Sequence, residues 1–303
     1  MDDSNTTATA TETAACCANF YEQDWVQEIL GESFHPGGPD LSARLIHSLN
    51  LPVDSRVVDV ACGIGTTSLM MARQFCLEPV GIDFSQANVD KALESAGTTP
   101  VVLAEFFQGA AENLPLEDES CDALVCECAV STFTDQPKVL KEFYRVLKPG
   151  GVVGISDMVV AGELPEDIAK SIAPWTCMAQ ARTPIGYQQL FLDAGFLANH
   201  YADESHTLLE LISDLKKKLL MASVGKTLGM LPGVPLDLKD IRRLLGQAKE
   251  LTEAGTVQYC RLLFSKGAPN HPLPALTPAP LAKLDCDGSK DCCCLQRSLF
   301  TSL

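Results

Sequence analysis

The chain has 303 residues, of which 46% are hydrophobic, enough to build the core of one large domain and to exclude a wholly disordered chain. Its 23 basic and 39 acidic side chains give a formal net charge of −16, which repels nucleic-acid phosphates and anionic membrane surfaces. We therefore expect a small-molecule substrate, and neither nucleic acid nor membrane as a partner. No apolar run approaches the ~18 residues that a membrane span needs.

The first residues carry no folding signal. Residues 1–15 are polar and repetitive, which predicts a disordered N-terminus. They lack the basic and apolar regions of a secretory signal, so we expect a cytoplasmic protein. The 13 cysteines are then expected to be thiols, and their odd number excludes complete intramolecular pairing. Residues 16–55 are expected to form a helical lid segment.

From residue 56 onward, short apolar runs alternate with helical patterns. The expected strands are Arg56–Ala61, Glu78–Ile82, Val101–Phe107, Asp122–Cys128 and Val152–Ser156. The expected helices are Thr66–Phe75, one after Ser85, and Gln136–Leu147, which the Lys-Pro-Gly-Gly run at 148–151 should end. This alternation favours an α/β fold with a doubly wound, mostly parallel sheet covered on both faces. Residues 56–160 are expected to form this core.

After Asp157 the pattern becomes mainly helical. The expected helices are Leu164–Met178, Thr183–Ala194, Thr207–Met221 and Leu236–Ala254, and Val257–Ser265 is expected to be a further strand. Residues 161–267 would thus supply substrate-side helices and the final strand. Residues 268–303 are expected to be a Pro-rich linker followed by a disordered Cys-rich tail that contains Cys292–Cys294.

A glycine-containing loop follows the first strand and opens a helix. Gly63 and Gly65 let the backbone turn tightly and approach a ligand. Asp83, at the tip of the second strand, can accept both hydroxyls of a ribose. Two features argue against a dinucleotide cofactor. Asp59 would repel a pyrophosphate, although it suits an ammonium group. In addition, Thr66 follows Gly65 where a dinucleotide-binding loop needs a further glycine. The pattern favours S-adenosyl-L-methionine, a nucleoside with a cationic amino-acid end.

Residues 56–157 resemble the class I S-adenosylmethionine-dependent methyltransferases. Ala61 replaces the first glycine of their loop, and Ala110 stands where their third-strand motif, here residues 108–115, usually has an aspartate. The resemblance implies a seven-stranded, Rossmann-like sheet. It also implies cofactor contacts from Asp59, Ala61, Cys62, Gly63, Gly65, Asp83, Ala111 and Glu112.

A narrower resemblance, over roughly residues 50–200, is to the arsenite methyltransferases. It rests on four segments: Cys128–Asp135, Val139–Lys148, Ser156–Asp157 and Glu163–Ile168. In that family one substrate thiol follows the fourth strand and a second lies in a later helical stretch, which implies Cys128 and Cys177 as catalytic thiols that bind arsenite. The family's third, upstream thiol has no counterpart here. Cys16, Cys17 and Cys62 are the candidates to replace it.

The chemistry of trivalent arsenic agrees with a site built from thiols. Arsenic is soft and prefers soft thiolate ligands. Its own lone pair is the nucleophile toward a sulfonium methyl group, so no general base is required and catalysis is mostly positioning. Methylated arsenic tends toward the pentavalent state. Spare thiols are expected to return electrons to it and form a disulfide, which thioredoxin or glutathione would reduce. The substrate would be arsenite or its thiol conjugates.

Two alternatives remain open from the sequence. The protein would be a methyltransferase for a carbon, nitrogen or oxygen atom of an organic small molecule, with Glu127 or His35 as the base and Cys128 and Cys177 as packing residues. The other alternative is a non-catalytic thiol protein that binds metalloids and whose cofactor site is idle. The replacement of the usual aspartate by Ala110 favours this alternative. Transfer of a labelled methyl group to arsenite separates these readings.

Overall fold

The computed structural model describes residues 35–97, 104–171, 177–178, 180–227, 238–271 and 273. Three sequence expectations therefore lie outside the described residues. They are the disordered N-terminus at 1–15, residues 16–34 of the lid segment with Cys16 and Cys17, and the Cys-rich tail.

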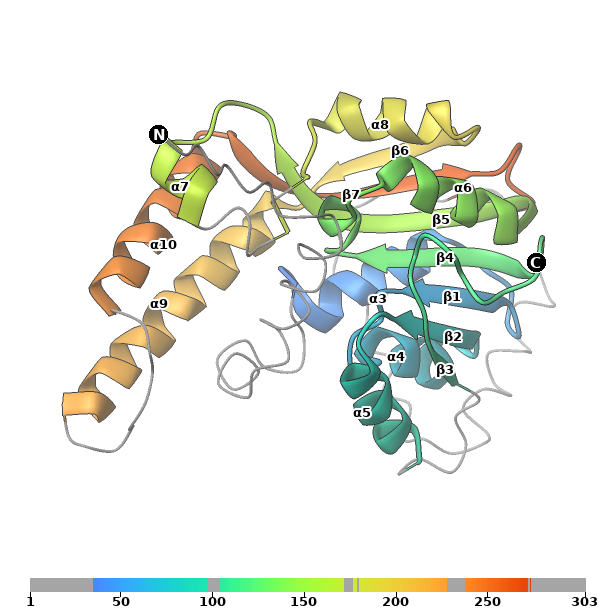
Figure 1. Ribbon diagram of the computed structural model, residues 1–303, viewed down its shortest axis with the longest axis horizontal. Helices are drawn as coiled ribbons and strands as arrows, with labels where there is room; N and C mark the ends of the chain where they lie inside the picture. Colours follow the sequence, from blue (N-terminus) through green and yellow to red (C-terminus); the bar gives the residue numbers. More distant parts are fainter. Residues whose placement is uncertain are drawn as a thin grey trace, which may run out of the picture.

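Seven strands form one sheet in the order β3-β2-β1-β4-β5-β7-β6 (Figure 1). The strands are β1 Arg56–Val60, β2 Glu78–Asp83, β3 Glu105–Gln108, β4 Cys121–Glu127, β5 Leu147–Val160, β6 Leu197–Asp203 and β7 Val257–Ser265. β7 is antiparallel to both of its neighbours, and the pairs from β3 through β5 are parallel. The predicted mostly parallel, seven-stranded, Rossmann-like sheet is confirmed.

Helices cover both faces of the sheet (Figure 1). One face carries α3 Gly38–Ser48, α4 Thr66–Phe75 and α5 Gln86–Gly97, and the other carries α6 Gln136–Val146 and α8 Pro184–Asp193. The remaining helical elements are η1 Val130–Thr132, α7 Glu166–Ser171, α9 Ser205–Thr227 and α10 Leu238–Glu253. α9 and α10 run side by side beyond the edge at which the parallel strands end (Figure 1).

The apolar runs of the strands explain this layering, because successive side chains of a strand point to opposite faces. On β1, Val58 packs with Phe143 and other buried residues of α6 and α8. Its neighbour Val57 packs on the opposite face with Leu45 of α3 and Met71 of α4. α3, which falls in the expected lid segment, is thus built into the core of the domain.

β5 is much longer than the predicted strand Val152–Ser156. α6 ends at Val146, within one residue of the predicted end before the Lys-Pro-Gly-Gly run. At the start of β5, Leu147 pairs with Cys121 and Val152 with Ala123, so the run also forms a bulge within this strand, which the sequence did not indicate. Gly150 adopts the left-handed conformation that such a bulge uses. At its far end β5 continues to Val160 because β7 supplies an antiparallel partner after β4 has ended.

The prediction of a helix over Leu164–Met178 was wrong at both of its ends. α7 begins at Glu166 and is described as far as Ser171, and Cys177 and Met178 lie in a turn. Residues 172–176 lie outside the described residues.

β6 was missed altogether by the sequence analysis. Its residues Leu197–Asp203 are partly or largely exposed, as expected for a strand at the edge of the sheet. An edge strand whose two faces are exposed to solvent has neither an apolar run nor a clear alternation of apolar and polar residues, so its sequence does not indicate a strand.

Candidate functional site

The expected site residues gather at one edge of the sheet. β1, β2 and β4 run parallel, so the loop after Val60, the tip residue Asp83 and the terminal residues Glu127 and Cys128 all lie at their carboxyl ends. Open α/β sheets bind ligands at this edge.

The loop between β1 and α4 needs its glycines. Ala61, Gly63 and Gly65 all have positive φ angles, of 60°, 56° and 81°. A Cβ on Gly65 would come within 2.8 Å of the Phe106 ring, so glycine is required where α4 begins. A Cβ on Gly63 would meet nothing within 4 Å. The backbone at Gly63 therefore borders open space at the expected cofactor position.

The carboxylate of Asp83 is fixed beside this loop. Its Oδ2 accepts a hydrogen bond from the Gly63 amide at 2.8 Å, and its Oδ1 accepts from the Ser85 amide at 2.9 Å and the Asn88 side chain at 3.3 Å. Asp83 is 8% exposed. This acceptor lies at the tip of β2, where the sequence predicts ribose binding.

Asp59 lies buried at the base of the same loop. The Ser68 hydroxyl donates to its Oδ2 at 2.7 Å. Burial, opposed by the hydrogen bond from Ser68 and reinforced by the nearby carboxylates of Glu127 and Asp83, raises the pKa of Asp59 to about 7. Three acidic side chains thus surround the loop, an environment that favours a cationic ligand.

Ala111 and Glu112 follow β3 at the same edge. Ala110 forms an isolated antiparallel bridge with Asn113, which closes a short turn around the two residues. Ala111 is buried against the core and Glu112 is half-buried.

Cys62 is placed apart from the other candidate thiols. Its side chain packs with Phe106 and the helix residues around it, and burial raises the pKa of its thiol. Cys128 and Cys177 belong to a different apolar cluster. The structure does not bring Cys62 together with them.

Cys128 and Cys177 lie in direct contact. Cys128 follows β4 in a left-handed conformation with φ 53°, and its amide donates to the Ser156 carbonyl at 2.7 Å. Its thiol is hydrogen-bonded to Cys177, which is 5% exposed. This hydrogen bond, together with burial, raises the pKa of the Cys128 thiol well above its usual range. Two residues distant in sequence thus form one thiol pair.

A polar network surrounds the carboxylate of Glu127, whose side chain is 6% exposed. The Ser42 hydroxyl donates to its oxygens at 3.0 and 3.1 Å, and the Thr67 hydroxyl donates at 2.8 Å. The His35 Nε2 lies 3.2 Å from the Ser42 Oγ and 3.8 Å from Glu127. Glu127 is therefore fixed by groups from α3, α4 and the segment before α3.

The network continues to the thiol pair. The Ser156 Oγ lies 3.5 Å from Glu127 Oε1, and the Tyr259 hydroxyl donates to Ser156 at 3.1 Å. The same Tyr259 hydroxyl is within hydrogen-bonding range of the Cys128 sulfur. Polar contacts thus link Glu127 to the thiols through buried side chains.

Sequence reasoning did not identify four members of this network: Ser42, Thr67, Ser156 and Tyr259. Two of them carried a signal in the sequence: Thr67 follows the glycine-containing loop at the start of α4, and Ser156 belongs to the Ser156–Asp157 segment of the family resemblance. Tyr259 lies within the last strand, where nothing in the local pattern separates it from a core tyrosine.

The cysteines of the described chain are all free thiols. They are Cys62, Cys76, Cys121, Cys126, Cys128, Cys177 and Cys260. Within the described ranges, no group of three or more His, Cys, Asp or Glu side chains is arranged to hold a metal ion. A third thiol for the pair is therefore not found in the part of the chain that the structure describes.

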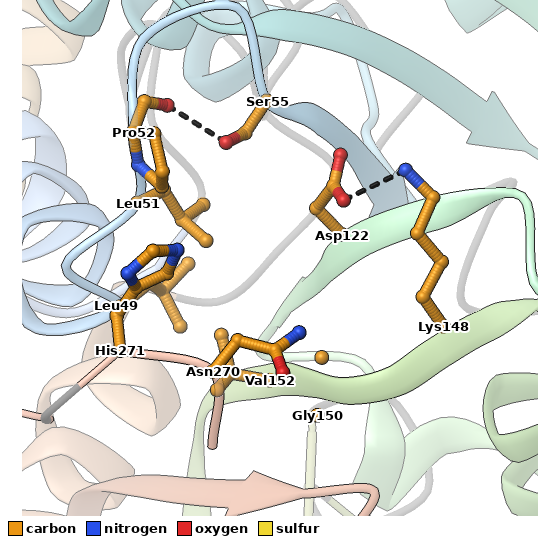
Figure 2. A pocket seen from close by; sticks show the side chains of 11 residues that line it. Leu49, Leu51, Pro52, Ser55, Asp122, Lys148, Gly150, Val152, Asn270 and His271 are labelled. Atoms are coloured by element: carbon orange, nitrogen blue, oxygen red, sulfur yellow. Dashed lines mark hydrogen bonds and ion pairs between the residues drawn. The ribbon is translucent and has the colours of Figure 1, made fainter.

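A separate pocket lies at the opposite edge of the sheet, where β1 and β4 begin (Figure 2). Its volume is about 70 Å³, and Asn270 and His271 form part of its wall. The ion pair between Lys148 and Asp122, at 2.7 Å, lines another side. None of the predicted site residues lines this pocket, so it takes no part in the candidate site.

Comparison with known proteins agrees with this geometry. A family described as methyltransferase domain matches residues 58–155. The chain is 30% identical over 161 residues to an arsenite methyltransferase of Halobacterium salinarum, covering 52% of this chain and 41% of the relative. It is 32% identical over 141 residues to phosphoethanolamine N-methyltransferase 1 of Arabidopsis thaliana, covering 46% of this chain and 28% of the relative. The chain thus spans less than half the length of these two relatives.

Solved structures share the fold. Phosphoethanolamine N-methyltransferase 2 of Haemonchus contortus, in complex with S-adenosyl-L-methionine, aligns with a TM-score of 0.68 at 18% identity, over 83% of this chain and 60% of that chain. The cyclopropane synthase MmaA2 of Mycobacterium tuberculosis aligns with a TM-score of 0.70 at 14% identity, over 86% and 100%. Among the described residues, the helices are too short or too polar to cross a membrane.

Proposed function

We propose that the protein transfers a methyl group from S-adenosyl-L-methionine to trivalent arsenic, because residues 58–155 match a methyltransferase-domain family and the sheet has the class I S-adenosylmethionine-dependent fold. The observation that carries the proposal is the contact between Cys128 and Cys177 at the carboxyl edge of the sheet.

The residues at the loop fit the cofactor. Open space at Gly63 admits a ligand against the backbone, and Asp83 presents a buried carboxylate at the ribose position. Asp59 and Glu127 add negative charge, which suits a ligand with ammonium and sulfonium groups. When bound, S-adenosyl-L-methionine supplies an electrophilic methyl group on a positively charged sulfur.

The thiol pair holds and orients the substrate. Cys128 and Cys177 bind arsenite as thiolates, with release of water, and direct the arsenic lone pair toward the methyl group. The cofactor would supply its methyl group to that lone pair and leave as a neutral thioether, so arsenic would lose two electrons and become pentavalent. Two thiols return the two electrons and form a disulfide, which thioredoxin or glutathione reduces.

Transfer of a labelled methyl group to arsenite tests the proposal. Cys128→Ser and Cys177→Ser should each abolish transfer while leaving cofactor binding intact, because oxygen is a poor ligand for a soft ion. Cys76→Ser is the matched control, since Cys76 ends α4 far from the loop and should keep full activity. Methylation of arsenite by the Cys128→Ser/Cys177→Ser double variant would refute the assignment.

One observation favours a second candidate, a methyltransferase for an organic small molecule. His35, Ser42 and Glu127 form a connected, largely buried acid–base group beside the loop. The similarity to phosphoethanolamine N-methyltransferases supports an amine as acceptor. Labelled transfer to small amines that survives Cys128→Ser/Cys177→Ser but is lost in Glu127→Gln would favour this function over arsenite methylation.

A further inference from the structure

Glu127 has a carboxylate that is almost completely removed from water. It ends β4 and directly precedes Cys128, and its side chain is 6% exposed. Its oxygens accept hydrogen bonds from the hydroxyls of Ser42 and Thr67. These neutral donors fix the carboxylate in place but do not cancel its charge. A buried charge of this kind is costly unless an opposite charge is brought to it.

Thr67 locates the carboxylate relative to the cofactor loop. Thr67 lies in the first turn of α4, two residues after Gly65, and its hydroxyl is 2.8 Å from Glu127 Oε2. On its other side, Glu127 adjoins Cys128, the first residue of the thiol pair. Glu127 therefore lies between the loop that would hold the cofactor and the thiols that would hold the acceptor.

A methyl group that passes from the cofactor to an acceptor at Cys128 must cross this same space. The sulfonium sulfur would then lie beside Glu127. A sulfonium has no N–H group to donate, and its positive charge is the feature that separates it from a thioether, so the buried carboxylate of Glu127 is suited to recognise it.

Resting on the proposed use of S-adenosyl-L-methionine, we propose that Glu127 is a specificity-determining residue that recognises the positive charge of the sulfonium. Methyl transfer removes that charge, because the product S-adenosyl-L-homocysteine is a neutral thioether. Glu127 thus favours the methyl donor over the product, and its attraction ends when the methyl group has left.

The other charged groups near Glu127 do not duplicate this role. Asp83 is hydrogen-bonded to the loop at the tip of β2, and Asp59 lies beneath the loop against Ser68. Both would face parts of the cofactor that the donor and the product share. Among the described residues, His35 is the basic side chain that approaches Glu127, with its Nε2 3.8 Å from Glu127 Oε2. His35→Gln should therefore not reduce the preference for the charged donor.

Calorimetric titration of the Glu127→Gln variant tests the inference. The ligands are S-adenosyl-L-methionine, S-adenosyl-L-homocysteine and sinefungin, an analogue with an amine in place of the sulfonium. The affinity for the methyl donor relative to the product should fall about tenfold or more, and sinefungin should follow the donor. The matched control is Glu142→Gln, whose carboxylate pairs with Arg145 on α6 and which should leave the ratio unchanged.

The results separate this inference from the proposed function. If the wild-type protein binds neither the donor nor the product, the proposed cofactor is wrong and the inference falls with it. If it binds both and Glu127→Gln weakens them equally or not at all, only the inference is refuted. Should Glu127→Gln fail to fold, the variants Glu127→Asp and Glu127→Asn replace it. The affinity for the methyl donor relative to the product should then be higher in Glu127→Asp than in Glu127→Asn. Equal ratios in that pair would overturn the inference.

Discussion

Two non-glycine residues of the site, Ala61 and Cys128, adopt left-handed backbone conformations. Such conformations cost on the order of 1–3 kcal/mol for a residue with a Cβ, so they persist only where the surrounding structure enforces them. At Cys128 the hydrogen bond from its amide to Ser156 helps to enforce it. Ala61 begins the cofactor loop, and Cys128 begins the segment that carries the thiol. Backbone strain is therefore found where the sheet passes into the candidate site.

The carboxylate of Asp83 provides a residue-scale prediction for the cofactor. Asp83→Ala removes the expected ribose acceptor and the partner of the Gly63 amide. Each lost buried hydrogen bond costs on the order of 1–3 kcal/mol, so the affinity for S-adenosyl-L-methionine should fall at least about tenfold. Titration calorimetry measures this. The exposed Asp118→Ala is the control, and unchanged affinity in a folded Asp83→Ala protein would show that the cofactor is placed wrongly.

Asp59 predicts how cofactor affinity depends on pH. Burial raises its pKa to about 7 in the ligand-free protein, and a cationic ligand favours the ionised form. Affinity for S-adenosyl-L-methionine should therefore rise as pH increases through about 7 and level off above it. Asp59→Asn should remove this part of the dependence. A titration series over this pH range whose slope is the same in both proteins would contradict the assignment.

At the scale of elements, a buried ionic group joins α3 to the sheet. Glu204, between β6 and α9, accepts hydrogen bonds from Arg261 of β7 at 2.6 Å and from Arg44 of α3 at 3.0 Å. Arg261 also donates to Ser48 at the end of α3. The helix that carries Ser42 is thus fixed to the antiparallel end of the sheet, and Ser42 is in turn fixed beside Glu127.

Loss of the central carboxylate should be strongly destabilising. Glu204→Gln would leave two guanidinium groups without their buried counter-charge, which typically costs about 3–5 kcal/mol. Urea unfolding followed by circular dichroism measures the change. The exposed pair of Glu253 and Lys249 supplies the control, because Glu253→Gln should change stability by less than about 1 kcal/mol. Equal effects of the two substitutions would contradict the role of Glu204.

At the scale of the whole molecule, two fully buried aspartates couple stability to pH. Burial raises the pKa of both Asp59 and Asp157 to about 7. Each folded-state pKa lies above the unfolded value, so between about pH 4 and pH 7 the folded state binds more protons than the unfolded state. This contribution to stability is complete at low pH and is lost as pH rises through about 7.

The ligand-free protein should therefore become less stable, by on the order of 5 kcal/mol, between about pH 5 and pH 8. Urea unfolding at several pH values checks this, and Asp59→Asn with Asp157→Asn should flatten the curve. Carboxyl groups with a lowered pKa, such as Glu142, change the stability only below about pH 5, so they do not offset the loss between about pH 5 and pH 8. A stability that increases over the same range would refute the burial argument.

The sequence alone determined the parallel core and the glycine-containing turn between β1 and α4. The boundaries of α4 agree with the prediction, and β1 and β2 differ from it by one residue each, because apolar runs and glycines act through local sterics and short-range periodicity. The class of fold follows from these local signals. The Lys-Pro-Gly-Gly run predicted the end of α6 to within one residue but not the bulge in β5, since proline and glycine occur at bulges as well as at helix ends.

Only the tertiary structure decided which side chains meet. β5 extends to Val160 because its partner β7 arrives from the other end of the chain, and the same strand brings Tyr259 toward Cys128. The contact between Cys128 and Cys177, and the group of hydroxyls around Glu127, join segments that are far apart in sequence. The physical reason is that periodicity reports which face of an element is buried, whereas contacts between elements depend on how the sheet orders its strands and where each strand ends.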